Sequence, residues 1–421
     1  MPLERFRRPS DFLWASGVED TFVPQTRPGH RALDEYQLVG HYQHWREDLA
    51  LAREVGVRAL RWGVPWYRVE PFEGEFDWRW TDQVLPYLVE ELGIPPIVDL
   101  VHYGCPFWLR REFASEHYPA AVAAYAEAFA RRYAGLVRWY TPLNEPIITA
   151  LMCGRRGLWP PYLRSEHGYL RVLVQVVKGI VLTCEALRLV DPDALLVHVD
   201  AGGLSRHARE DLQAVAEEDR DRRFLPYDLL TGRVRPDHRL FPWLVRNGIS
   251  PDDLAGIAAR RPPIDIMGLN FYPQWSTTQL YTDKRGRLAY RPVQEDGAGF
   301  TELITEYWER YGIPIMVTET SARGSEEVRA RWLEASVAAV RALRRAGVPV
   351  VGYTWFPLFT MVDWRYRFGR GPVEEYRLEL GLFTLGDSAA GPRWLPTPLA
   401  EQFRSYTQDS EQSVGSLAPP A

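Results

Sequence analysis

The chain has 421 residues, of which 46% are hydrophobic and 25% are charged, proportions typical of a globular protein. Its net charge of -5 argues against nucleic acid or an anionic membrane surface as the main partner. The cysteines Cys105, Cys153 and Cys184 show no short spacing, which argues against a disulfide framework or a zinc site. No apolar signal segment is visible, and no apolar run approaches about 20 residues. We therefore expect a cytoplasmic location and no transmembrane helix.

Short runs of apolar, β-favouring residues recur along the chain and alternate with longer helical patterns. Runs that are apolar almost throughout are typical of parallel strands buried on both faces. The expected strands are residues 12–17, 57–64, 95–103, 137–146, 194–202, 264–272, 313–320 and 349–358. Amphipathic patterns predict helices over residues 45–56, 119–135 and 325–347, each ahead of a strand.

Eight strands separated by helices predict a single α/β domain, a (β/α)8 TIM barrel, over residues 1–406. Residues 203–262 are expected to add helices and loops, and residues 273–300 a long loop with a hairpin near 280–290. Residues 407–421 lack apolar periodicity and are expected to be disordered. A doubly wound open sheet is the alternative fold, but ASGVED at residues 15–20 is no glycine-rich phosphate loop.

Two glutamates stand where expected strands end. Glu145 closes the fourth strand and Glu319 the seventh, so in a barrel they face each other across its mouth. Glycoside hydrolysis requires such a pair: one protonated carboxyl group donates to the leaving oxygen, while the other attacks the anomeric carbon or activates water. Sixteen Trp residues, whose flat apolar faces suit sugar rings, agree with a carbohydrate ligand.

The neighbours of the two glutamates indicate their roles. Asn144 beside Glu145 is uncharged, so Glu145 can keep a raised pKa and its proton. Arg61 and Tyr272, at the ends of the second and sixth strands, can stabilise an ionised Glu319. We therefore predict Glu319 as the nucleophile and Glu145 as the acid/base.

The motifs around these residues resemble those of glycoside hydrolase family 1, the β-glucosidase-like (β/α)8 barrels. TPLNEP at residues 141–146 resembles the family's T-x-N-E-P acid/base motif, and VTETSARG at 317–324 resembles its [IV]-T-E-N-G nucleophile motif. Further similar stretches are residues 12–17, 41–71, 76–106, 268–273 and 352–364. The resemblance implies a retaining β-glycosidase that forms a covalent glycosyl-enzyme and acts on a small-molecule glycoside or oligosaccharide.

The resemblance also assigns binding roles. Asn144 matches the residue that binds the sugar 2-hydroxyl, and His102 matches the histidine near the 3-hydroxyl. Arg61 and Tyr272 match the residues that hold the nucleophile. The other expected substrate-binding residues are Asn270, Trp355, Asp363 and Trp364. The family's eighth-strand Trp sits one position after Trp355, which makes Phe356 an alternative.

Departures from the family pattern concern the glycon, the sugar on the non-reducing side of the scissile bond. The family's first strand leads to a Gln that holds the 3- and 4-hydroxyls, and the same offset here falls on Phe22. The candidates for its role are Glu19, Asp20 and Gln25. Asp363 stands where the family has a longer Glu. We therefore expect a divergent member with an altered glycon pocket.

Two other functions remain open. A transglycosidase, or a glycosidase of specialised metabolism, would use the same site with a different acceptor. A carbohydrate-binding barrel without catalysis is more distant, because both glutamates are present. No HxxxH or HxH cluster, G-x-G-x-x-G motif or P-loop occurs, so neither a metal nor another cofactor is expected. The sequence does not determine the oligomeric state.

Overall fold

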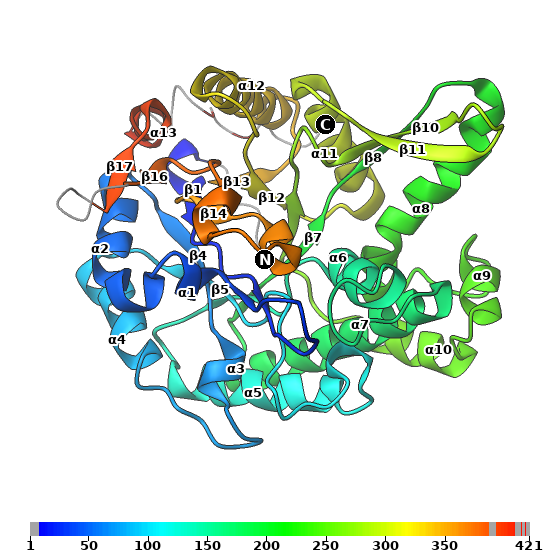
Figure 1. The fold of residues 1–421 in the computed structure, drawn as a ribbon, viewed down its shortest axis with the longest axis horizontal. Helices are drawn as coiled ribbons and strands as arrows, with labels where there is room; N and C mark the ends of the chain where they lie inside the picture. The colour runs from blue at the N-terminus through cyan, green and yellow to red at the C-terminus, as the bar shows by residue number, and fades with distance from the viewer. Residues whose placement is uncertain (1–7, 387–392, 409–413, 415–416, 418–421) are drawn as a thin grey trace.

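The computed structural model of the protein describes residues 8–386, 393–408, 414 and 417, and it contains a closed barrel of parallel strands (Figure 1). Around the barrel the strands are β1 (Leu13–Gly17), β4 (Ala59–Gly63), β5 (Pro96–Asp99), β6 (Trp139–Thr141), β7 (Leu195–Ala201), β9 (Ile266–Asn270), β12 (Ile315–Thr320) and β13 (Val350–Trp355). Each lies within one of the eight expected ranges. Parallel pairing of β1 with β13 closes the barrel, which confirms the TIM barrel and excludes the open sheet.

Apolar side chains fill the interior of the barrel, and every barrel strand contributes to them. This cluster consists of Ala15, Ala59, Ile97, Trp139, Val197, Val199, Ile266, Met316 and Val351. Because side chains alternate between the two faces of a strand, the neighbouring positions pack outward against the helices. The polar residues that follow this cluster along the strands are thereby placed at the carboxyl ends of the barrel.

Helices surround the barrel (Figure 1). The longer ones are α2 (His41–Glu54), α5 (Tyr118–Arg132), α7 (Glu166–Val190), α8 (Gln213–Leu230), α10 (Pro251–Arg260), α11 (Gly297–Tyr311), α12 (Glu326–Arg345) and α13 (Pro398–Gln408). The short ones are α1 (Glu35–Leu38), α3 (Trp66–Val69), α4 (Thr81–Pro86), α6 (Pro146–Ala150) and α9 (Phe241–Arg246). The helices expected at 45–56, 119–135 and 325–347 correspond to α2, α5 and α12. Among the described residues, no helix is long and apolar enough to cross a membrane.

A three-stranded sheet stands beside the barrel, next to α8 (Figure 1). The hairpin of β10 (Thr277–Thr282) and β11 (Leu288–Val293) is the one expected near residues 280–290. β8 (Leu204–His207) joins β10 in parallel, although we expected only helices and loops in this region. The sequence LSRH of β8 lacks an apolar pattern, so only pairing with β10 makes it a strand.

Shorter strands form within the loops near the ends of the chain and around the barrel mouth. They are β2 (Phe22–Val23), β3 (Leu33–Asp34), β14 (Met361–Val362), β15 (Arg377–Leu378), β16 (Phe383–Leu385) and β17 (Trp394–Pro396). The expected tail begins inside α13, which runs to Gln408. Apart from Val414 and Leu417, the rest of that tail lies outside the described residues.

Candidate active site

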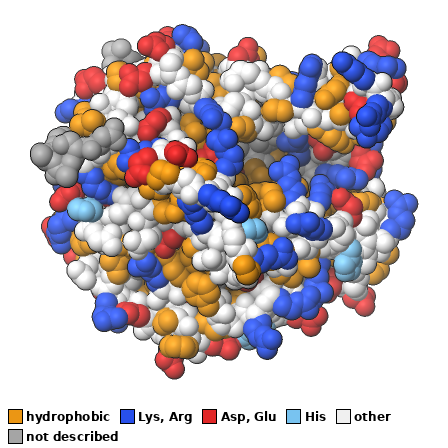
Figure 2. Space-filling view, in the orientation of Figure 1, with side chains coloured by type: hydrophobic (Ala, Val, Ile, Leu, Met, Phe, Trp, Pro, Cys, Tyr) orange, Lys and Arg blue, Asp and Glu red, His pale blue; other side chains and the backbone are white. Residues whose placement is uncertain are grey.

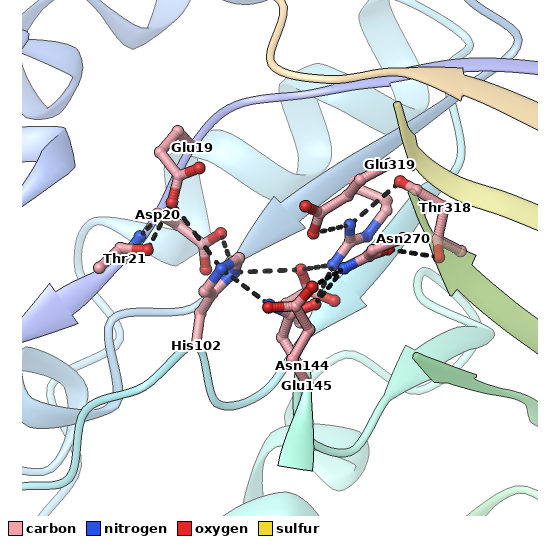
Figure 3. Close-up of polar contacts among 12 residues, drawn as sticks. Glu19, Asp20, Thr21, His102, Asn144, Glu145, Asn270, Thr318 and Glu319 are labelled. Carbon is pink, nitrogen blue, oxygen red and sulfur yellow. Dashed lines mark hydrogen bonds and ion pairs between the residues drawn. The ribbon is translucent and has the colours of Figure 1, made fainter. Parts of the chain in front are cut away.

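The predicted catalytic residues converge at the carboxyl ends of the barrel strands (Figure 3). Glu319 lies in β12 and Arg61 in β4, while Glu145 follows β6 and begins α6. On this face of the molecule the surface is hollowed near the ends of β7 and β12 (Figure 2). The barrel therefore brings together residues that are far apart in the sequence.

Both carboxylate oxygens of Glu319 accept hydrogen bonds. Nη1 of Arg61 donates to Oε1 at 2.6 Å, and the Tyr272 hydroxyl donates to Oε2 at 2.7 Å. Burial opposes the charge on Arg61, but Asp99 and Glu319 outweigh it and raise the pKa of the guanidinium above its usual value. A cation and a phenol on one carboxylate favour its ionised form. Arg61 and Tyr272 thus both contact Glu319, and their role in supporting a nucleophile stays a prediction.

Asp99 holds the other side of Arg61, and the sequence reasoning missed it. Nη2 of Arg61 donates to Oδ2 of Asp99 at 2.6 Å and to Oδ1 of Asn144 at 3.0 Å. Burial would raise the pKa of Asp99, but the charge of Arg61 outweighs it and lowers this pKa. The available signal was an acidic residue closing the apolar run PPIVD.

Glu145 contacts neutral donors instead of a cation. The Tyr103 hydroxyl donates to its Oε2, and Nδ2 of Asn270 donates to its Oε1 at 2.9 Å. Burial, reinforced by the charge of Glu319, raises the pKa of Glu145 to about 7. A carboxyl group with this pKa can both give and take a proton near neutral pH.

The backbone of Glu145 is strained in a way that aims its side chain. Its φ of 47° lies in the left-handed region, which costs energy for a residue with a Cβ. The N–H of Glu145 donates to the Val199 carbonyl at 3.1 Å, which anchors the peptide to β7. Tyr103 has a comparable φ of 71°. Such conformations cluster at functional sites, and here both residues share one hydrogen bond.

Asn144 and Asn270 connect the two halves of the site. Oδ1 of Asn144 accepts from Arg61 and, at 3.3 Å, from Nδ2 of Asn270. The Thr318 hydroxyl donates to Oδ1 of Asn270 at 2.7 Å and so fixes the orientation of this amide. Glu319, Arg61 and Glu145 thus belong to one hydrogen-bonded network.

The residues after β1 show what stands where the family has Gln. Phe22 stacks on Tyr67 with ring centroids 3.5 Å apart, and Gln25 is exposed. Glu19 and Asp20 lie in the site (Figure 3). Oδ1 of Asp20 is 2.7 Å from Nδ1 of His102. The first-strand loop therefore presents two carboxyl groups to the site in place of an amide.

His102 lies between these carboxyl groups and Asn144. Its Nε2 is 3.0 Å from Nδ2 of Asn144 and 3.8 Å from Oε1 of Glu19. Burial opposes a charged imidazole, but Asp20, Asp99 and Glu19 outweigh it and raise the pKa of His102 well above its usual value. His102 thus reaches the site as predicted.

Asp20, Asp99 and His102 have potential ligand atoms within 4.8 Å of one another. A metal ion would compete there with Arg61, which already donates to Oδ2 of Asp99. The donor set therefore fits an ion-pair network better than a metal site.

Trp355 and Phe356, at the end of β13, differ in whether they approach the site. Trp355 is fully buried, and its Nε1 donates to the Leu380 carbonyl at 3.0 Å, so the structure does not place it at the site. The adjacent Phe356 ring lies 5.3 Å from the Arg61 guanidinium carbon. One residue of register separates the two, and side chains on a strand alternate in direction.

Asp363 and Trp364 differ in what they contact. The carboxylate of Asp363 accepts from the guanidinium of Arg365 at 2.8 and 3.0 Å and caps the short helix that starts at Trp364. Trp364 packs edge-to-face on Tyr103, with ring centroids 5.5 Å apart. Trp364 therefore borders the site through Tyr103, whereas Asp363 is engaged by its own neighbour.

The sequence of the chain is similar to those of known glycosidases. Residues 16–200 match the family model "Glycosyl hydrolase family 1". β-Glucosidase A of Thermotoga maritima is 23% identical over 358 residues, which cover 77% of this chain and 78% of that protein. A bifunctional β-D-glucosidase/β-D-fucosidase of Bifidobacterium breve is 27% identical over 78% of this chain and 81% of its own length. An aryl-phospho-β-D-glucosidase of Bacillus subtilis is 23% identical over 81% of each chain.

The fold is also that of solved structures. A Thermotoga maritima β-glucosidase in complex with deoxynojirimycin superposes with a TM-score of 0.80. The superposition covers 96% of this chain and 99% of that one at 17% sequence identity.

Proposed function

We propose that the chain is a retaining β-glycosidase of glycosyl hydrolase family 1, with Glu319 as nucleophile and Glu145 as acid/base. The observation that carries this assignment is the contrast between the two carboxyl groups. Glu319 accepts from a cation and a phenol, whereas Glu145 accepts from neutral donors and has a pKa of about 7. A double displacement uses two carboxyl groups in such different environments, one as the nucleophile and one as the acid/base.

In the first step, ionised Glu319 attacks the anomeric carbon while the bond to the leaving oxygen breaks. Glu145 gives its proton to that oxygen, and the sugar becomes an ester of Glu319. In the second step, Glu145 takes a proton from water as the water attacks the same carbon. The ester bond breaks, the free sugar leaves and both carboxyl groups return to their starting states.

Arg61 and Tyr272 orient Glu319 for the attack, because each binds one of its oxygens. Their donors also suit the carboxylate as it leaves the sugar in the second step. Asn144 is proposed to bind the sugar 2-hydroxyl next to the scissile bond, and His102 the adjacent hydroxyl.

The substrate class is a small O-linked β-glycoside or oligosaccharide, in keeping with relatives that are named β-glucosidases. A transglycosidase that uses the same residues is the second candidate. Trp275, 46% exposed and 5.5 Å from the Tyr272 ring, offers an apolar surface to an organic acceptor. The ratio of transfer to an added alcohol over hydrolysis distinguishes the two. A cytoplasmic location stays a prediction.

The assignment is tested with a 2-deoxy-2-fluoro β-glycoside that carries an activated leaving group. We expect a covalent adduct on the peptide that contains Glu319 and loss of activity at the rate of its formation. Glu319→Ala should abolish both adduct formation and hydrolysis of an activated aryl β-glycoside. Hydrolysis that persists in Glu319→Ala, or an adduct on another residue, would overturn the assignment.

A further inference from the structure

Carboxyl groups outnumber cations in the part of the site that receives the glycon. Arg61 is shared between Asp99 and Glu319, and His102 lies against Asp20. Glu19 remains. Within the described residues its nearest cationic partner is His102, at 3.8 Å, which already serves Asp20. Even with His102 protonated, Glu19 has no counter-charge of its own.

Glu19 offers a free oxygen to the site. Its Oε1 accepts from the backbone N–H and the hydroxyl of Thr21, at 3.1 and 2.5 Å. Its Oε2 accepts no hydrogen bond from the residues that the structure describes, although Glu19 is only 8% exposed. Figure 3 shows this second oxygen turned toward the space that His102, Glu145 and Glu319 also border. This oxygen is therefore available to accept a hydrogen bond from a ligand in the site.

The surroundings favour a positive donor over a neutral one. Burial raises the pKa of Glu19 to about 7, against the opposing charge of His102. The charges of Glu319 and Asp20 act on Glu19 in the same direction as burial. An ammonium group beside Glu19 would be attracted to these carboxyl groups, whereas a phosphate or carboxylate would be repelled.

We propose that Glu19 selects a glycon that carries an ammonium group, so that the substrate is a β-glycoside of an amino sugar. Asn144 and Glu145 lie on the other side of His102 from Glu19 (Figure 3). The amine therefore belongs on the edge of the ring remote from the bond that breaks. This inference rests on the proposed glycosidase function and adds the chemical class of the glycon.

The test compares aryl β-glucosides that differ in one group: the parent, its 3-amino-3-deoxy and 4-amino-4-deoxy analogues, and its 6-phosphate. We expect kcat/KM at pH 7 to favour one amino analogue over the parent by about tenfold to hundredfold, the gain of a charge-assisted hydrogen bond. The 6-phosphate should be the poorest substrate. In Glu19→Gln the ratio of kcat/KM for the favoured amino analogue to kcat/KM for the parent should fall to about one.

The matched control is Glu73→Gln, which removes a carboxylate that is 62% exposed and paired with His117 outside the site. It should keep the full preference for the amine. A wild type that prefers the parent glucoside, or a Glu19→Gln variant that keeps the amine preference, overturns the inference and leaves the glycosidase function intact.

If no glucoside is hydrolysed, calorimetry tests the amine selectivity of Glu19 independently of the glycosidase function. The free 3-amino and 4-amino sugars and glucose are titrated into the wild type and Glu19→Gln. Tighter binding of an amino sugar that is lost in Glu19→Gln supports the role of Glu19 even when the catalytic assignment fails. Equal binding of all three sugars rejects it.

Discussion

The Tyr103 hydroxyl donates a hydrogen bond to Oε2 of Glu145 and accepts one, at 3.1 Å, from Nδ2 of Asn144. Tyr103 thereby joins the acid/base to the amide proposed to bind the sugar 2-hydroxyl. Burial raises the pKa of Glu145, and the Tyr103 phenol, which stabilises an ionised carboxylate less than a cation does, does not cancel this rise.

This relationship predicts the pH dependence of the reaction. The first step needs protonated Glu145, so kcat/KM should fall as the pH rises through about 7, the pKa that burial gives Glu145. Tyr103→Phe removes a donor that favours the ionised form, so the pKa and the alkaline limb should move to higher pH. A pH profile of kcat/KM for an aryl β-glycoside measures this shift. Tyr140→Phe, remote from the site, should leave the profile unchanged, and a shift of Tyr103→Phe toward lower pH would contradict the argument.

Arg61→Lys tests the bridge between the nucleophile and Asp99. Lysine keeps the charge but cannot donate at once to Glu319, Asp99 and Asn144 as the guanidinium does. We expect kcat to fall by about 100-fold or more, with slower inactivation by the fluoroglycoside. The exposed pair of Arg46 and Glu91 provides the control, because Arg46→Lys should be silent. A fall in KM alone, without loss of kcat, would refute this role.

Glu145 should lower the stability of the fold at alkaline pH. Its pKa is raised from 4.5 to about 7 on folding, so the folded state holds the proton more tightly than the unfolded state. The free energy of unfolding that Glu145 contributes therefore declines as the pH rises from about 4.5 to 7 and stays low above that.

The amide of Glu145→Gln does not titrate, so this variant should be more stable than the wild type by about 1–3 kcal/mol at pH 8. At pH 4 the two proteins should have similar free energies of unfolding. Urea unfolding at both pH values measures the difference. A gain that is the same at pH 4 and pH 8 would mean that the titration of Glu145 is not its cause.

Gly63→Ala should displace the carboxylate of Asp20, which lies in the site. A Cβ at position 63 would lie 1.5 Å from Oδ2 of Asp20, so this carboxylate must move and its contact with His102 is lost. We expect a raised KM and a loss of stability of about 1–3 kcal/mol. Gly256→Ala in α10 is the matched control, since its Cβ would meet nothing within 4 Å and a helix favours alanine. An unchanged KM for Gly63→Ala would detach Asp20 from substrate binding.

Trp355 and Phe356 should respond differently to substitution. Trp355→Phe removes the hydrogen bond to the Leu380 carbonyl and leaves that buried oxygen unpaired, which costs about 1–3 kcal/mol of stability. Phe356→Ala uncovers Arg61 and should change KM and kcat. Thermal unfolding and steady-state kinetics of both variants separate the two effects. A Trp355→Phe variant with a raised KM and normal stability would restore the predicted binding role of Trp355.

The barrel and the convergence of the proposed catalytic pair could be predicted from the sequence, because both depend on local patterns. Buried parallel strands require continuous apolar runs, and all eight runs became barrel strands. Polar residues at the ends of such runs must gather at one face of a closed barrel, so Glu145, Glu319, Arg61 and Tyr272 were found together.

The rest depended on which side chains meet across loops. Tyr103, whose own backbone is left-handed, donates a hydrogen bond to Glu145. Asp99 accepts one from Arg61, which lies on the adjacent strand. One residue of register decides that Phe356, and not Trp355, reaches Arg61. The presence of Glu19 and Asp20 was visible in the sequence, but their approach to His102 was not. The sequence by itself determined the fold and which carboxyl groups lie at the barrel mouth. Tertiary packing decided which charges surround them, because an electrostatic environment depends on distances between residues that no local pattern specifies.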